Sequence, residues 1–126
     1  MGLVAALAAY YFLGSASENG FSDVRAVVSA LESEGIACEQ LNVSAPDPTP
    51  DIVDFGSCQV DGRTVNLHVY KNSEALEEHI DGNVKAREIG NPNYFTSLVA
   101  GSNWVVDTYS EETSGLIQEA LGGELH

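Results

Sequence analysis

Apolar residues recur at helical spacing in three segments of the chain, and each segment ends at residues that break helices. The first predicted helix is capped by Ser22 and stopped by Gly35, which tolerates the positive φ of a helix C-terminus. The second is capped by Ser73 and is ended or interrupted by residues 81–83. The third is capped by Ser110 and is followed by two glycines.

Five segments rich in β-branched and aromatic residues are predicted to be β-strands. They are residues 36–43, 57–60, 64–70, 94–100 and 103–109. Asp61-Gly62, between the second and third of these, is a strong signal for a tight hairpin with a type I′ turn. The predicted element order is α-β-β-β-α-β-β-α. This order indicates an α+β fold, with an antiparallel sheet of about five strands and helices packed on one face.

The N-terminal residues 1–17 form a signal-like or anchor segment, and residues 18–126 form a single α+β domain. The apolar run 3–13 suits the core of a signal peptide and is too short to span a bilayer, although no basic residue precedes it. An ordinary helix packed on the domain is the alternative. If residues 3–13 are retained, their apolar surface needs a cover such as lipid or another chain, and they are the expected route to a membrane.

Cys38 and Cys58 are the two cysteines of the chain. An even count in an apparently exported protein predicts one disulfide, which would stabilise the fold by about 3 kcal/mol. Two buried free thiols are the alternative, whereas a redox pair is disfavoured because the spacing is unlike Cys-x-x-Cys. The predicted compartment is extracytoplasmic, either secreted or membrane-associated.

The charge balance limits the partners. The chain has 19 acidic and 5 basic residues, a formal net charge of -14. Such a surface repels the phosphates of nucleic acids and the anionic face of membranes, so no nucleic-acid partner is expected. A protein partner or a small cationic ligand remains open, as do solubility and adaptation to high salt.

The densest set of potential metal ligands falls in the second predicted helix and consists of Glu74, Glu77, Glu78, His79 and Asp81. Glu74 and Glu78 are neighbours at i, i+4, and Asp81 follows. A solvated acidic helix face is the favoured interpretation, so no metal site is assigned and these three residues are weak candidates for one.

The candidate binding surface combines two regions. Asp47, Asp51 and Asp54 lie in or beside a proline-rich loop, for which a solvated connector is the alternative. His68 and Tyr70 share the polar face of the strand 64–70. A general-base role for His68 is conceivable, but no motif places a nucleophile beside it.

No known catalytic or nucleotide-binding motif is present, so no catalytic residue and no cofactor are assigned. The single tryptophan, Trp104, lies in an apolar strand, and core packing is favoured over an aromatic ligand patch with Tyr94 and Phe95.

Three short stretches carry a resemblance, namely Ile36-Ala37-Cys38, Gly56-Ser57-Cys58-Gln59-Val60-Asp61-Gly62 and Gly101-Ser102-Asn103-Trp104-Val105-Val106. On these the chain resembles small secreted or lipid-anchored proteins of Gram-positive bacteria, especially actinobacteria. The resemblance implies an exported α+β domain with a cysteine pair and implies no activity. The sequence lacks the cysteine to which lipid would be attached.

These observations favour an extracytoplasmic, non-enzymatic binding or accessory protein. One alternative is a membrane-anchored accessory subunit of a larger complex that retains residues 3–13. The other is a small hydrolase or metal-dependent enzyme that uses His68 or the acidic residues of 77–81.

Overall fold

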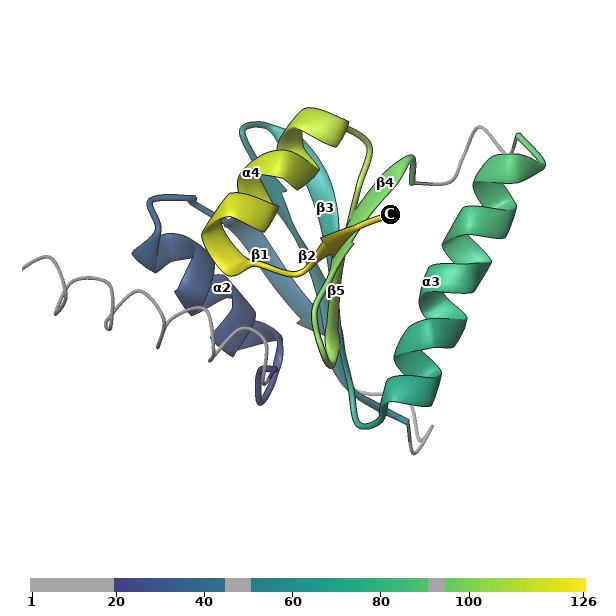
Figure 1. Cartoon of the computed structure of the whole chain (residues 1–126). Coiled ribbons are helices and arrows are strands. Elements are labelled where there is room, and N and C mark those ends of the chain that lie inside the picture. The colour runs from purple at the N-terminus through teal and green to yellow at the C-terminus, as the bar shows by residue number, and fades with distance from the viewer. Residues whose placement is uncertain (1–19, 45–50, 91–94) are drawn as a thin grey trace, which may run out of the picture.

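The protein folds around one antiparallel sheet with the strand order β1-β2-β3-β5-β4-β6 (Figure 1). The computed structural model describes residues 20–44, 51–90 and 95–126. In chain order the elements are α2 (Val24–Ser33), β1 (Glu39–Ser44), β2 (Ile52–Val60), β3 (Arg63–Tyr70), α3 (Ser73–Glu88), β4 (Ser97–Ala100), β5 (Trp104–Thr108), α4 (Glu111–Leu121) and β6 (Glu124–Leu125). The predicted α+β class and element order are confirmed. The sheet has six strands rather than about five, because the two residues of β6 pair with β4 after the last helix.

The helices lie on both faces of the sheet. Helices α2 and α4 cover one face and α3 covers the other (Figure 1). The expectation that all helices share one face is therefore wrong for α3. Its Leu76 packs in a second small core with Leu98 and Val105. Every residue of β4 and β5 is buried, and strands buried on both faces need a layer on each side.

The main core lies between the sheet and the helices α2 and α4. Four residues of α2 are buried there against β3, whose Val65, Leu67 and Val69 are fully buried. Trp104 is also fully buried, with the ring of Phe21 edge-on at 5.8 Å. This confirms core packing for the tryptophan. The same alternation leaves the even-numbered residues of β3 on the side of α3.

Two helices begin one position away from the predicted caps. The side chain of Asp23, rather than Ser22, caps α2, and Asn72, rather than Ser73, caps α3. Serine, aspartate and asparagine are comparable N-caps, so adjacent candidates could not be ranked from the sequence. Ser110 caps α4 as predicted.

Helix α3 continues through residues 81–83 and ends at Glu88, so the predicted end or interruption at these residues is wrong. A glycine inside a helix costs about 1 kcal/mol relative to alanine. Asn83 is fully buried, and its side chain bonds to both the sheet and the last turn of α3. These tertiary contacts outweigh the local preference of Gly82.

The hairpin and the disulfide are confirmed. Asp61 and Gly62 have φ values of 52° and 75°, as a type I′ turn requires. Cys38 and Cys58 are joined, with their Cα atoms 5.4 Å apart, and Cys58 is buried in the main core. The disulfide therefore links the segment before β1 to β2 and indicates an oxidising environment.

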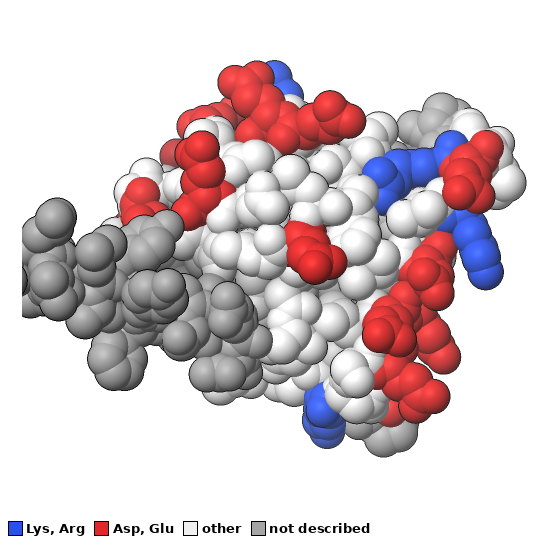
Figure 2. Space-filling view, in the orientation of Figure 1, with Lys and Arg blue, Asp and Glu red and all other residues white. Residues whose placement is uncertain are grey.

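Acidic side chains gather along α3 and above α4, with a largely uncharged area between them (Figure 2). The predicted segment 1–17 and the candidate Asp47 lie outside the described residues. Within the described ranges, none of the helices has the length and apolar character that crossing a membrane demands.

Candidate functional site

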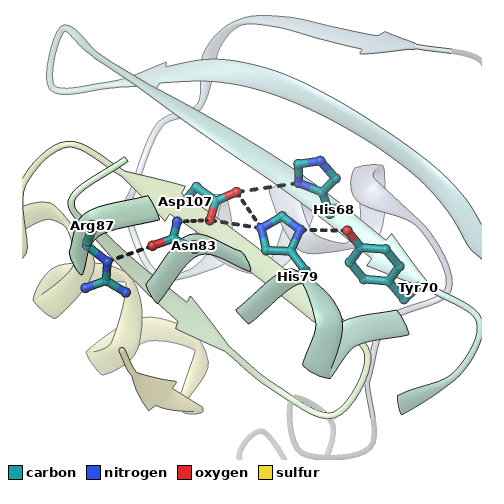
Figure 3. A network of polar contacts seen from close by, with 6 residues as sticks. All are labelled: His68, Tyr70, His79, Asn83, Arg87 and Asp107. Carbon is teal, nitrogen blue, oxygen red and sulfur yellow. Dashed lines mark hydrogen bonds and ion pairs between the residues drawn. The ribbon is translucent and has the colours of Figure 1, made fainter. Parts of the chain in front are cut away.

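A cluster of polar side chains lies where α3 packs on the sheet (Figure 3). His68 comes from β3 and Asp107 from β5, and Asn66, two residues before His68, is paired with Asp107. Side chains two residues apart on a strand share a face, so His68 and Asp107 are diagonal neighbours under α3. His79 and Asn83 are i, i+4 on α3, which directs both toward this point.

His79 is held at both ring nitrogens. Its Nε2 lies 3.0 Å and 2.9 Å from the two carboxylate oxygens of Asp107, and its Nδ1 lies 2.6 Å from the Tyr70 hydroxyl. Because a carboxylate only accepts, Nε2 carries the hydrogen and Nδ1 accepts from Tyr70. The result is an ordered chain of Tyr70, His79 and Asp107.

Asp107 is a buried carboxylate, only 2% exposed. Besides His79, its Oδ1 accepts a hydrogen bond of 3.2 Å from the Asn83 side-chain amide. The amide oxygen of Asn83 in turn accepts from Arg87 Nε at 2.7 Å, and Arg87 also donates to the carbonyl of Thr96. Donors from α3 thus compensate the cost of burying this charge and fix the carboxylate's orientation.

His68 and Arg87 are the incompletely bonded members of the cluster, since His68 Nδ1 and Arg87 Nη2 are buried without a hydrogen-bond partner among the described residues. The Nδ1 of His68 lies 3.7 Å from the nearer Asp107 oxygen. The His68 ring stacks between Phe55 at 5.9 Å and Tyr70 at 6.0 Å, and meets the His79 ring edge-on at 4.7 Å. Burial, and secondarily the neighbouring His79, lowers the pKa of His68 from 6.5 to about 4, against the opposing effect of Asp107. The imidazole is therefore neutral at pH 7.

A shallow groove of about 260 Å³ opens beside His68 on the part of the sheet formed by β1, β2 and β3. The strand register builds it from two rows on the side of α3. Each row crosses the three strands. One row consists of Asn42, Ser57 and Asn66, and the other consists of Ser44, Phe55 and His68. Among the described residues, the groove's side-chain lining is made of amides, hydroxyls and rings, with no carboxylate, lysine or arginine.

A larger hollow of about 460 Å³ lies elsewhere along α3, lined in part by Leu76, Ile80 and Ala100. Its charged lining includes Glu124, whose side chain is 83% exposed and meets His126 at 3.7 Å. An exposed pair of this kind is not preorganised, so this hollow offers less chemistry than the cluster around His79.

The acidic residues predicted as a binding surface are separated by the fold. Asp54 accepts a hydrogen bond of 2.9 Å from the backbone of Val24 at the start of α2. Asp51 accepts one of 3.1 Å from the side chain of Asn72, which caps α3. Both acids therefore contact helix starts, whereas His68 and Tyr70 lie together in the polar cluster.

Glu74, Glu78 and Asp81, the weak metal candidates, are exposed on α3. In the part of the chain that the structure describes, the group with metal-ligand geometry is instead His68, His79 and Asp107. These residues come from three different elements, so their proximity is a product of the tertiary fold.

Sequence reasoning did not assign Asn83 or Asp107 to a site, and it named His79 only among the potential ligands of the second predicted helix. One signal was present for Asp107, because a carboxylate in an otherwise apolar strand must find donors when it is buried. The i, i+4 spacing of His79 and Asn83 was a second signal, since both residues lie on one helix face.

No protein-family model matches the chain, and comparisons with curated proteins and with solved structures give no match. The chemistry of the cluster and groove is therefore the basis for the function. The cluster can relay a proton or hold a cation, and the groove can hydrogen-bond and stack a small ligand.

Proposed function

We propose that the protein is an extracytoplasmic, non-enzymatic binding domain that holds a small neutral saccharide in the groove across β1, β2 and β3. The disulfide between Cys38 and Cys58 supports a compartment outside the reducing cytoplasm. A domain that binds a ligand without converting it would act as an accessory protein, because it would present the ligand to another protein or retain it.

The observation that carries this proposal is the groove's lining. Asn42, Asn66 and the two serines supply donors and acceptors that bear no charge, and Phe55 supplies an aromatic face. Small-molecule sites generally combine an apolar surface with a few polar groups that fix orientation. At about 260 Å³ the groove suits a single small ring.

A saccharide fits this lining better than a cation does. Hydroxyl-rich rings offer both donors and acceptors to amides, and their C–H faces pack on aromatic rings. A cationic ligand, suggested by the net charge, would find no carboxylate among the described residues that line the groove, and His68 is neutral at pH 7. On the face seen in Figure 2, acidic side chains gather along α3 and above α4 instead.

A hydrolase is the second candidate, because Tyr70, His79 and Asp107 form an acid–base chain. A serine hydrolase uses such a histidine to activate its nucleophile. Here both nitrogens of His79 are occupied, by Tyr70 and Asp107, and no serine or cysteine is bonded to it within the described residues. Binding is therefore the better-supported role.

Titration calorimetry of the full chain tests the proposal, with glucose and N-acetylglucosamine as neutral probes and lysine as the cationic probe. Saturable binding of a neutral sugar is expected. Phe55→Ala should weaken it roughly 3- to 10-fold, since aromatic packing contributes about 0.5–1.5 kcal/mol. Tyr109→Ala, an exposed aromatic outside the groove, is the matched control and should leave affinity unchanged.

Two outcomes would contradict the proposal. One is heat from lysine alone, with none from either sugar at millimolar concentration. The other is sugar binding that Phe55→Ala and Tyr109→Ala affect equally, because the groove would then not be the binding surface.

The membrane-anchored alternative depends on residues 3–13 and stays a separate prediction. The intact mass of the protein purified from its native source decides it. A mass that corresponds to a chain starting near Glu18 supports the secreted form. A mass that includes the residues from Met1 supports the anchored form.

A further inference from the structure

We propose that His68, His79 and Asp107 bind one divalent transition-metal ion of the zinc class at the junction of α3 and the sheet (Figure 3). This inference does not rest on the saccharide proposal, although the two sites share His68, which also lines the groove. One ligand atom from each of the three residues lies within 4.8 Å of the others.

The spacing suits a tetrahedral ion. With metal–ligand bonds of about 2.0–2.1 Å, neighbouring ligand atoms around such an ion lie roughly 3.3 Å apart. The observed separations from Asp107 Oδ2 are 2.9 Å to His79 Nε2 and 3.7 Å to His68 Nδ1. These two values bracket the required one, and the separation between the two imidazole nitrogens, which lies within 4.8 Å, would also have to approach it when the ion binds.

The unpartnered nitrogen of His68 is an independent observation that points to a ligand. A buried polar atom without a partner costs about 1–3 kcal/mol, and most such atoms in folded proteins are paired. Its nearest charged neighbour is the Asp107 carboxylate. A cation between the two would satisfy the nitrogen and neutralise the buried carboxylate.

The surrounding residues already hold the ligands in place. Asn83 donates to Oδ1 of Asp107, and Oδ2, which contacts Nε2 of His79, would exchange that contact for the metal. Tyr70 contacts Nδ1 of His79, as outer partners of metal-binding histidines do. On metal binding the hydrogen moves from Nε2 to Nδ1 of His79, which then donates to the Tyr70 oxygen.

The donor set selects the class of ion. Two imidazoles and one carboxylate favour zinc and its transition-metal neighbours, whereas calcium and magnesium prefer oxygen ligands alone. Three protein ligands leave a fourth position for water or a bound molecule. The side chains of His68 and His79 are 21% and 12% exposed, which leaves a path from solvent.

Metal titration of the tag-free full chain, stripped with chelator, is the test. One equivalent of Co²⁺ should give the visible absorption of a tetrahedral site, and Zn²⁺ should displace it. Nitrogen NMR of the imidazoles should show that the hydrogen of His79 moves from Nε2 to Nδ1 on Zn²⁺ binding. Ca²⁺ and Mg²⁺ should compete with neither ion.

His68→Phe is the decisive variant. It keeps a ring between Phe55 and Tyr70 and removes both ring nitrogens, among them the Nδ1 that lacks a partner, so the fold should persist, as circular dichroism would verify. Zinc affinity should fall roughly 100-fold or more. His126→Gln, which changes a histidine outside the cluster, is the matched control and should bind as the unaltered protein does.

The proposal is overturned if no saturable one-to-one binding of Co²⁺ or Zn²⁺ is found. It is also overturned if His68→Phe binds zinc with unchanged affinity while remaining folded. Loss of binding in His126→Gln rather than in His68→Phe would place the ion at the C-terminus instead.

Discussion

Replacing His68 by phenylalanine should remove an acid-sensitive contribution from the stability of the metal-free protein. The pKa of His68 is lowered from 6.5 to about 4 in the folded state, chiefly by burial. The groups that face it are His79 on α3, Asp107 on β5, and the Phe55 and Tyr70 rings that flank it on the sheet. Only 21% of its side chain is exposed, so solvent screening is modest.

The sign of the effect follows from proton uptake. Between pH 6.5 and about 4 the unfolded chain binds a proton at His68 and the folded protein does not. The free energy of unfolding is therefore undiminished above pH 6.5 and decreases as the pH falls through this window. A difference of about 2.5 pKa units corresponds to about 3 kcal/mol at the acidic end.

Urea unfolding at pH 7, 5.5 and 4 in the presence of chelator measures this effect. The unaltered protein should lose about 3 kcal/mol more than His68→Phe between pH 7 and pH 4. Parallel stability profiles for the two proteins would refute the reasoning, because they would mean that His68 titrates alike in both states.

Three further predictions concern stability at neutral pH. Replacing Cys38 and Cys58 by serine should lower the free energy of unfolding by about 3 kcal/mol in urea titrations, the chain-entropy value for this loop; an unchanged urea midpoint would contradict a structural role for the bridge. Gly101→Ala would place a methyl group against the Trp104 indole and should lower the free energy of unfolding by about 1–3 kcal/mol. Gly115→Ala, in open space on α4, should raise it by up to about 1 kcal/mol. Thermal melts that rank the two variants the other way would contradict the packing described. Asn83→Ala should cost about 2–3 kcal/mol, since it removes a donor from a buried carboxylate, and near-native stability in the same melts would show that α3 does not need this contact.

The sequence was sufficient for the local elements whose signals are short-range. Asp61-Gly62 requires two left-handed residues and therefore formed the predicted hairpin. The apolar stripe of α2 and the cap at Ser110 are equally local. The disulfide followed from the even cysteine count and the apparent export of the chain.

The placement of α3 depended on contacts that are distant in sequence. Its apolar residues are few, and Gly82 argued for a break, but Asn83 bonds to Asp107, which lies 24 positions away. The consecutive apolar residues of β4 and β5 indicated burial on both faces, which requires a helix on each side. That reasoning would have corrected the one-face prediction.

The candidate site was recognised only in part for the same reason. His68 was noted on the polar face of its strand, but its neighbours depend on which strand pairs with β3. Because β5 rather than β4 lies beside β3, Asp107 comes under α3 beside His68. Strand order of this kind is set by the packing of the whole domain, and a single sequence does not reveal it.

Chemical-shift mapping of the full chain with a saturating neutral sugar tests the central claim most directly. The account predicts that perturbed amides are confined to β1, β2 and β3 on the side of α3, with Asn42 and Asn66 side chains among the largest shifts. Shifts that are centred on α2 and α4, or no shifts with any sugar, would contradict the assignment of this groove as the binding surface.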